Sequence, residues 1–205
     1  GRILGLCLAN RDIRLIGKKA DYMVTCSQSL ANMYKDRHNI EVGFIRNGVD
    51  TERYEVPTQE EKNAKRKELG IPLDKKVLVF TGQVSSRKNQ SFVVKSFTEI
   101  NNPDLFLIIL GDGPALSGLR ELYGQNKNIL FMGHVTNVAD FLKASDIYVS
   151  SSTSEGLPIG ALEAMSAGLP LLLSGIPQHK EIVDVEEGIG SIFVNNNFDS
   201  FKTNS

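Results

Sequence analysis

The sequence predicts an α/β fold in which a doubly wound parallel sheet carries helices on both faces. From residue 75 onward, short apolar runs alternate with helix-like segments, and the loops between them carry Gly, Ser or Asn. The apolar runs are continuous, as in LFLIIL (105–110), rather than alternating with polar residues. Continuous runs are typical of strands covered on both faces, which favours parallel pairing.

The elements of this repeat follow one another at regular spacing. Strands are expected at VLVFT (77–81), LFLIIL (105–110), ILFM (129–132), IYVSS (147–151), LLLS (171–174) and SIFV (191–194). Helices are expected at about 90–100, 115–125, 138–144, 159–167 and 178–184. The chain ends in FVNNNFDSFKTNS, where we expect the start of a further helix or a truncated or disordered polar end.

The first fifty residues differ from this repeat. They predict a smaller βαβ piece: a helix to about Lys19, a strand at 22–26, a helix at 28–37 and a strand at 42–46. NGVD is a turn signal, and the polar segment after it predicts a solvated connection with one helix. We therefore expect three regions, which are residues 1–46, a connection at 47–75 and a larger domain at 76–205.

Composition excludes several classes of protein. Of 205 residues, 41% are apolar and 23% are charged, which is average for a globular chain. The 23 basic and 24 acidic residues nearly balance, so the basic surface that nucleic-acid binding needs is not expected. Cys7 and Cys26 lack the paired spacing of zinc sites and disulfide frameworks, which indicates a reducing compartment. Apolar runs fall far short of the roughly 20 residues that span a bilayer, and no signal-peptide pattern is present.

The stretch SSTSEGLPIGALEAMSAGLP (151–170) carries the first candidate site. Ligands of open α/β sheets bind at the carboxyl ends of the strands, where this stretch begins. Gly156 permits close approach to the backbone, and amides near Leu157 and Ile159 at the helix start favour an anion. Glu155 and Glu163 are candidates to accept hydrogen bonds from the hydroxyls of a sugar and a ribose, respectively. Alternatively, Glu155 is an acid favoured by the helix dipole and Glu163 is a solvated surface residue.

Three other loops reach the same edge of the sheet. TGQVSSRKN brings Gly82, Arg87 and Lys88, and the two cations either neutralise a diphosphate or are solvated surface charges. GDGP places Gly113 in a tight turn. Either a ligand lies against the backbone of this turn, or the turn has no role beyond connecting the strand to the next helix. In GHV, the backbone at Val135 is a candidate contact for a nucleobase.

Taken together, these motifs resemble the retaining glycosyltransferases of family 4, also called group 1 glycosyltransferases. The motifs are NGVD, TG with a lysine six residues after the glycine, GDGP, FMGHV, ASDIYVSSSTSEGLPIGALEAMSAGLP and the strand after it. The most specific is Glu155 and Glu163 with seven residues between them, followed by AMSAGLP. The resemblance covers roughly residues 20–195 and implies a GT-B architecture of two Rossmann-like domains. This chain would be its C-terminal, donor-binding half.

The resemblance also implies a role for each residue. Gly82 and Lys88 match the glycine and lysine that bind the diphosphate, and the backbone from 156 to 159 matches a phosphate and sugar contact. Glu155 matches the acid that contacts the donor hexose, so Lys88 and Glu155 are the expected catalytic residues. Glu163 matches the acid that binds the ribose.

Two further positions bear on the donor. The loop around Val135 matches the contact to the base. The family commonly has an arginine directly after the diphosphate-binding glycine, and this chain has Gln83 there. The lost cation predicts weaker stabilisation of the leaving group, unless Arg87 reaches the phosphates instead.

The implied activity is transfer of a hexosyl group from a nucleoside diphosphate sugar, of UDP or GDP type, to an acceptor hydroxyl with retention. No metal or other cofactor is expected, since cations and amides stabilise the leaving diphosphate. Residues 1–46 would be the tail of the acceptor-binding domain, so this chain alone is expected to bind donor without turnover. The implied acceptor is a saccharide or a lipid-linked saccharide in cell-surface polysaccharide assembly. The protein would then be cytoplasmic, with peripheral association at the inner membrane face.

Two other functions compete with this reading. A nucleotide-binding or regulatory module that transfers nothing is consistent with Gln83. A dinucleotide-dependent oxidoreductase is disfavoured because no G-x-G-x-x-G follows the first strand of the repeat.

Overall fold

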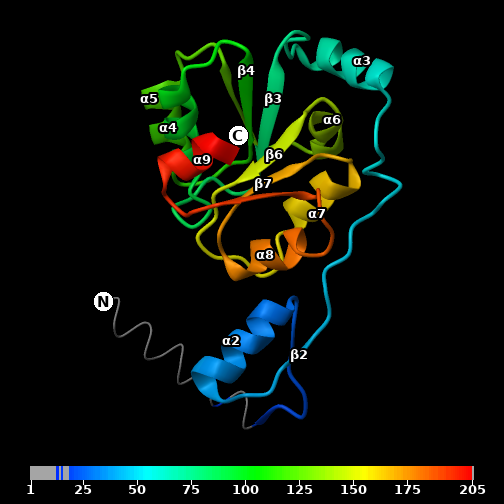
Figure 1. The fold of residues 1–205 in the computed structure, drawn as a ribbon, viewed down its shortest axis with the longest axis vertical. Helices are drawn as coiled ribbons and strands as arrows, with labels where there is room; N and C mark the ends of the chain where they lie inside the picture. Colours follow the sequence, from blue (N-terminus) through cyan, green and yellow to red (C-terminus); the bar gives the residue numbers. More distant parts are fainter. Residues whose placement is uncertain (1–12, 14, 16–18, 205) are drawn as a thin grey trace. The chain divides into compact units, whose positions relative to one another are not determined.

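The computed structural model describes residues 13, 15 and 19–204 of the chain. The chain divides into two compact units, Gly1–Asn47 and Gly48–Ser205, and Figure 1 labels most of their elements. Cys7 and most of the helix expected before Lys19 lie outside the described residues. Among the residues that are described, no helix has the length and apolar character needed to cross a membrane.

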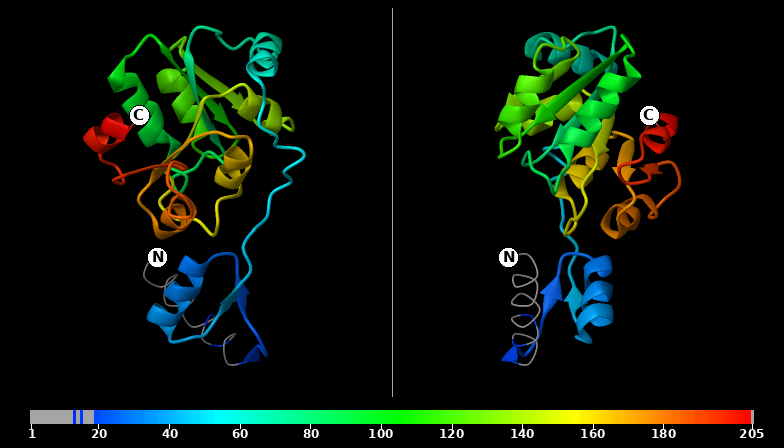
Figure 2. Two further views of the ribbon diagram at one scale, coloured as in Figure 1. Left: turned by 45° about the vertical axis from the view of Figure 1, so that its right-hand side comes forward. Right: turned by 90° about the vertical axis from the view of Figure 1, so that its left-hand side faces the viewer.

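The first unit contains the small βαβ piece that the sequence predicts. Strands β1 (Val24–Thr25) and β2 (Gly43–Phe44) pair in parallel, and helix α2 (Gln28–His38) connects them. Figure 2 shows α2 lying along this strand pair. The Ser27 side chain caps the helix start by accepting from the Leu30 amide, which satisfies one of the donors that a helix start leaves unpaired.

The second unit is built around a six-stranded, fully parallel sheet. Its strands are β3 (Lys76–Thr81), β4 (Leu105–Leu110), β5 (Ile129–Gly133), β6 (Ile147–Ser150), β7 (Leu171–Ser174) and β8 (Gly190–Phe193). Its helices are α3 (Gln59–Leu69), α4 (Gln90–Ile100), α5 (Leu116–Tyr123), α6 (Val138–Lys143), α7 (Ile159–Ser166), α8 (Pro177–Val183) and α9 (Phe198–Asn204). The predicted fold class is confirmed, with the expected strands in the expected places.

The order of the strands sets where a ligand can bind. It is β5-β4-β3-β6-β7-β8, so the chain winds outward from β3 on one side and from β6 on the other. Adjacent strands whose connections leave in opposite directions form a switch point, and a crevice opens at their carboxyl ends. The loops after β3 and β6 therefore border the place where a doubly wound sheet binds its ligands.

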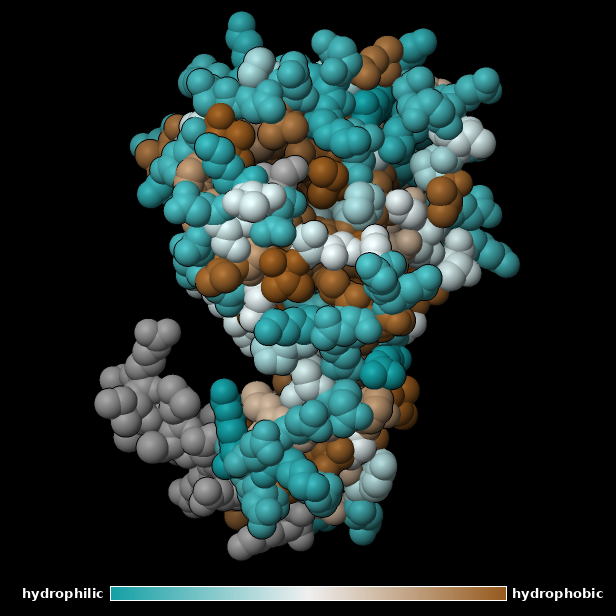
Figure 3. Space-filling model, in the orientation of Figure 1, coloured by the Kyte–Doolittle hydropathy of each residue, from teal (hydrophilic) through white to brown (hydrophobic). Residues whose placement is uncertain are grey.

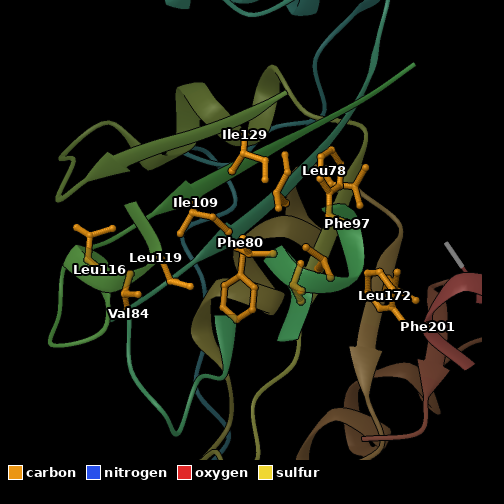
Figure 4. Packing of buried hydrophobic residues seen from close by; sticks show 14 of the residues in the cluster. Leu78, Phe80, Val84, Phe97, Ile109, Leu116, Leu119, Ile129, Leu172 and Phe201 are labelled. Carbon is orange, nitrogen blue, oxygen red and sulfur yellow. The ribbon is translucent and has the colours of Figure 1, made fainter. Parts of the chain in front are cut away.

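Alternate residues of the strands serve the two faces of the sheet. Leu78 and Phe80 of β3 enter a core with residues of α4, α5 and α9, such as Phe97 and Phe201 (Figure 4). Thr81, the residue after Phe80, lies on the face that α7 covers, where a side chain on Gly160 would clash with the Thr81 and Tyr148 hydroxyls. Because residue 160 is a glycine, α7 packs closely against the strands at the carboxyl end of the sheet.

Most of the expected connection at 47–75 belongs to the second unit. Helix α3 begins with a capping box formed by Thr58 and Glu61 and ends at Gly70 in the left-handed conformation. Its Arg66 is buried and donates to the carbonyls of Ala144 and Lys75 and to Asp146. In the space-filling view the surface around α3 is predominantly hydrophilic (Figure 3), as the sequence QEEKNAKRKEL requires.

The end of the chain corrects one expectation. Residues Phe198–Asn204 form helix α9, so the alternative of a disordered end is wrong for them. Phe201 is buried and packs edge-to-face on Phe92 and Phe193, with ring centroids 5.7 Å and 5.2 Å away. This aromatic cluster holds the last helix against α4 and β8.

Candidate functional site

Two pockets lie side by side at the carboxyl ends of the strands. The first has a volume of about 440 Å³ and is lined by residues after β3, β4 and β5: Thr81, Gly82, Gln83, Leu110, Gly111, Asp112, His134, Val135 and Val138. The second, of about 390 Å³, adds the loop after β6 and the start of α7: Thr81, Gly82, Lys88, Val138, Glu155, Leu157, Pro158, Ile159, Gly160 and Glu163. Both contain Thr81, Gly82 and Val138, so one extended ligand can occupy them together.

Glycines bring the loops after β3 and β4 into close contact. Gly82 and Gly111 have φ angles of 129° and 137°, which side-chain-bearing residues rarely adopt. A side chain on Gly111 would clash with the Gly82 backbone, and one on Gly82 would meet the Lys88 side chain at 3.3 Å. The pocket floor between the two loops is therefore bare backbone, with Lys88 beside it.

Glu155 is held between two cations. Lys88 Nζ lies 2.6 Å from Glu155 Oε1, and Arg87 Nη1 lies 2.9 Å from Glu155 Oε2. The same Arg87 nitrogen donates to the Ser154 carbonyl at 2.8 Å. Only 6% of the Glu155 side chain is exposed, whereas 48% of the Arg87 side chain is. The two candidate cations of the first loop thus meet the first candidate acid.

These contacts decide the charge of Glu155. Burial raises the pKa of its carboxyl, but the hydrogen bonds from Lys88, Ser152 and Arg87 and the charge of Lys88 lower it further, so the net pKa lies below its ordinary value of 4.5. Glu155 is therefore ionised at neutral pH. Together with the two cations it leaves one net positive charge beside the pocket.

Glu163 has a partner that the sequence did not indicate. The Tyr54 hydroxyl donates to Glu163 Oε1 at 2.7 Å, and Tyr54 itself is only 5% exposed. Burial, with help from the Glu163 carboxylate, raises the pKa of Tyr54 to about 12, so the hydroxyl keeps its proton. No motif signals this pair, because 109 positions separate the two residues.

Helix α7 presents its first turn to the second pocket. The helix begins at Ile159, with Pro158 as an extended N-cap that offers no side-chain cap. Because an uncapped helix start carries positive potential, the wall formed by Leu157, Pro158, Ile159 and Gly160 favours an anion.

The remaining predicted residues divide between the pockets and their surroundings. Gln83 and Val135 line the first pocket. Gly113 and Gly156 are not among the residues that line either pocket. At Gly113, with a φ of 155°, a side chain would clash with Val84 backbone, so Gly111 is the glycine of this turn that faces the pocket.

A buried histidine supports the loop that carries Glu155. His179 Nδ1 lies 2.9 Å from the carbonyl oxygen of Ser174 and 3.0 Å from its hydroxyl, and that hydroxyl donates to the Ser152 carbonyl at 2.6 Å. Because a carbonyl only accepts, Nδ1 carries the proton of the neutral ring. His179 Nε2 is buried and has no hydrogen-bond partner among the described residues. Burial lowers the pKa of His179 to about 4, against opposing effects of Ser174 and Glu155.

The fold and the paired pockets define a Rossmann-like α/β protein with its ligand site at the switch point of a parallel sheet. The sequence profile of the family Glycosyl transferases group 1 matches residues 61–204, and the chain belongs to this family. The predicted membership in the group 1 glycosyltransferases is thereby confirmed.

Curated relatives agree with this membership. The chain is 31% identical over 204 residues to the UDP-Gal:alpha-D-GlcNAc-diphosphoundecaprenol alpha-1,3-galactosyltransferase of Escherichia coli, which covers 96% of this chain and 48% of the relative. It is 28% identical to the alpha-monoglucosyldiacylglycerol synthase of Streptococcus pneumoniae, over 80% of this chain and 39% of the relative. The chain thus spans about half the length of the curated relatives it matches.

Solved structures show the same fold. A crystal structure of Anabaena HepE in complex with UDP and glucose superposes with a TM-score of 0.79 at 19% identity, covering 95% of this chain and 56% of that one. WaaG, a glycosyltransferase involved in lipopolysaccharide biosynthesis, superposes with a TM-score of 0.73 at 20% identity, covering 89% and 51%. This likeness in fold agrees with the predicted architecture.

Proposed function

We propose that this chain binds a nucleoside diphosphate sugar as part of a retaining hexosyltransferase of family 4. The observation that carries the proposal is the convergence of Lys88, Glu155, Glu163 and the start of α7 on one pocket. A phosphate-binding element, a cation and two hydroxyl acceptors are the groups that a sugar nucleotide requires. The relative from Escherichia coli, which is named as a galactosyltransferase, supports the same class of reaction.

Each part of the donor has a proposed place. The diphosphate lies over Gly82 and between Lys88 and the first turn of α7. The ribose lies at Glu163, the hexose lies at Glu155, and the base extends into the first pocket toward Val135. This orientation uses the continuity of the two pockets at Thr81, Gly82 and Val138.

The ion pairs of Glu155 with Lys88 and Arg87 offset its negative charge, which would otherwise repel a diphosphate in the pocket. A lysine ammonium has three N–H donors, and Lys88 spends one of them on Glu155. Because Arg87 also neutralises Glu155, the charge of Lys88 remains effective toward an anion in the pocket. Arg87 therefore supports the site indirectly. The position that commonly holds an arginine in the family holds the uncharged Gln83 in this chain.

The proposed reaction breaks the bond between the anomeric carbon and the β-phosphate oxygen. The diphosphate leaves with the bonding electrons, and the acceptor oxygen forms its bond to the anomeric carbon on the same face. The departing phosphate oxygen takes the acceptor proton, so no side-chain base is assigned. Negative charge grows on the leaving group, so Lys88 and the α7 amides contribute by preorganised electrostatics. We propose no metal or other cofactor for this site.

The acceptor side is proposed from the relatives. The names of two of them describe a diphosphoundecaprenol-linked sugar and a glycolipid, which favours a saccharide or lipid-linked acceptor. A cytoplasmic location with peripheral contact to a membrane fits such an acceptor. Since the relatives are about twice as long as this chain, we propose that the region N-terminal to the second unit binds the acceptor. This chain alone is then expected to bind donor with little turnover.

Calorimetric titration with UDP, GDP, ADP and the matching sugar nucleotides tests the proposal. One nucleotide should bind, and Lys88→Ala and Glu163→Ala should each weaken its binding roughly ten-fold or more, because each removes a charged hydrogen-bonding group. Lys95→Ala is the matched control, since Lys95 pairs with Glu99 on α4 and its side chain is 67% exposed. Equal binding by the wild type and both site variants would contradict the proposed site.

A nucleotide-binding module that transfers nothing is the second candidate, and Gln83 is the observation in its favour. Binding assays do not separate it from the transferase. A longer form of the protein that contains this chain, given the nucleotide sugar that binds, should release free nucleoside diphosphate in the presence of lipid-linked saccharides. Absence of release, with donor binding intact, would favour the module.

A further inference from the structure

The segment before α3 is fastened to the site at several points. Asp50 accepts from the amides of Glu52 and Arg53, which fixes a turn. The turn brings Tyr54 onto α7, where Ser166 Oγ donates to the Tyr54 carbonyl at 2.9 Å. Arg53 donates to the Thr136 carbonyl at 3.2 Å, next to the first pocket. The backbone of this segment is thus held independently of the Tyr54 hydroxyl.

The Tyr54 hydroxyl makes a separate contact, and its target is the pocket carboxylate Glu163. The 2.7 Å hydrogen bond engages Oε1 only. A carboxylate has about four lone-pair positions, so among the described residues Glu163 keeps one acceptor position on Oε1 and two on Oε2. Two acceptor oxygens side by side match two adjacent hydroxyl groups, such as those of a ribose.

A terminal carboxylate rotates easily, because its last torsion has a broad and roughly two-fold energy profile. A ligand that binds both oxygens fixes this torsion, and the entropy lost in fixing it lowers the affinity. A hydrogen bond to one oxygen from a buried tyrosine stops it in advance. The effect is largest for a ligand with two adjacent hydroxyls and small for a ligand with one.

We propose that Tyr54 is a positioning residue that presets Glu163 for a vicinal diol and so favours ribonucleotides over 2′-deoxyribonucleotides. The inference rests on the proposed function, in which Glu163 receives the ribose. It adds a residue outside the sheet-edge loops to the determinants of specificity.

The test compares UDP and GDP with 2′-deoxy-UDP and 2′-deoxy-GDP by calorimetry on the wild-type chain, Tyr54→Phe and Ser166→Ala. Tyr54→Phe removes only the hydroxyl, and we expect roughly a three- to ten-fold loss of affinity for the ribonucleotide that binds. The 2′-deoxy form should lose little, so the ratio of the two affinities should fall. Ser166→Ala breaks the backbone tie and should leave that ratio as in the wild type.

A second variant pair guards against an indirect effect on folding. In a Glu163→Ala background, Tyr54→Phe should no longer change the ratio of affinities, and thermal unfolding should show both proteins folded. A wild-type ratio in Tyr54→Phe would overturn the inference and leave the proposed function standing. If the wild-type chain bound none of UDP, GDP and ADP, the proposed function would fail, and the inference with it.

Discussion

Glu155 is buried and still charged, because its hydrogen bonds and ion pairs lower the pKa of its carboxyl by more than burial raises it. Lys88 and Arg87 each take one of its oxygens, and the lowered pKa follows from these contacts. A carboxyl whose pKa is lowered in the folded state stabilises the fold above its ordinary pKa of 4.5 and loses that effect as the pH falls further. Above pH 4.5 Glu155 therefore keeps its ion pairs with Lys88 and Arg87.

His179 predicts a pH dependence in a different range. Its folded pKa is about 4 against an ordinary 6.5, so between these values the unfolded chain binds a proton that the folded chain does not. Stability therefore falls as the pH drops from about 6.5 to about 4, by about 3 kcal/mol from this residue. His179→Asn keeps a donor toward Ser174 and cannot titrate, so urea unfolding at a series of pH values should show a flatter dependence.

The control for this prediction is His134→Asn, at an exposed position on the first pocket. It should retain the dependence of the wild type between pH 7 and 4. A wild-type slope in His179→Asn would mean that the buried ring is not the group responsible.

At the scale of elements, one buried arginine fastens α3 to the sheet. Arg66 reaches Asp146 at 2.6 Å, and Asp146 also accepts from the Val77 amide and from Lys62. The arginine thereby joins the helix to the start of β3 and to the loop before β6. A buried cation with three acceptors is well satisfied, but its removal leaves the acceptors short of a donor.

We therefore expect Arg66→Met to lower the free energy of unfolding by about 2–4 kcal/mol. Lys65→Met is the matched control on the same helix, because the Lys65 pairs with Glu68 and Asp140 are more exposed. It should change stability by less than about 0.5 kcal/mol. Equilibrium urea unfolding measures both, and equal losses would show that Arg66 does not carry the attachment.

At the scale of the whole molecule, the sequence predicted what local patterns determine. The sheet followed from continuous apolar runs such as 105–110, and the site edge followed from the rule that ligands bind where parallel strands end. The same rule predicts that Glu155 and Lys88 lie at one edge of the sheet, where the structure has them as an ion pair. The sequence does not distinguish helix α9 from a disordered end, because its apolar residues are two phenylalanines, Phe198 and Phe201, among polar residues.

The rest depended on contacts between distant parts of the chain. Tyr54 has no local feature that points to Glu163, and Arg66 lies in a helix whose composition is that of a solvated surface. Such contacts arise only when the folded sheet brings the segments together. The sequence could name the acids and cations of the site, but not which of them hold one another.

We propose that one sugar nucleotide spans both pockets in a fixed orientation. A crystal structure of this chain with the nucleoside diphosphate that binds tests it most directly. The diphosphate should lie within hydrogen-bonding distance of Lys88 Nζ and the first turn of α7. The ribose hydroxyls should reach Glu163, and the base should lie at Val135. A nucleotide bound away from these residues, or bound with its base at Glu155, would contradict the assignment.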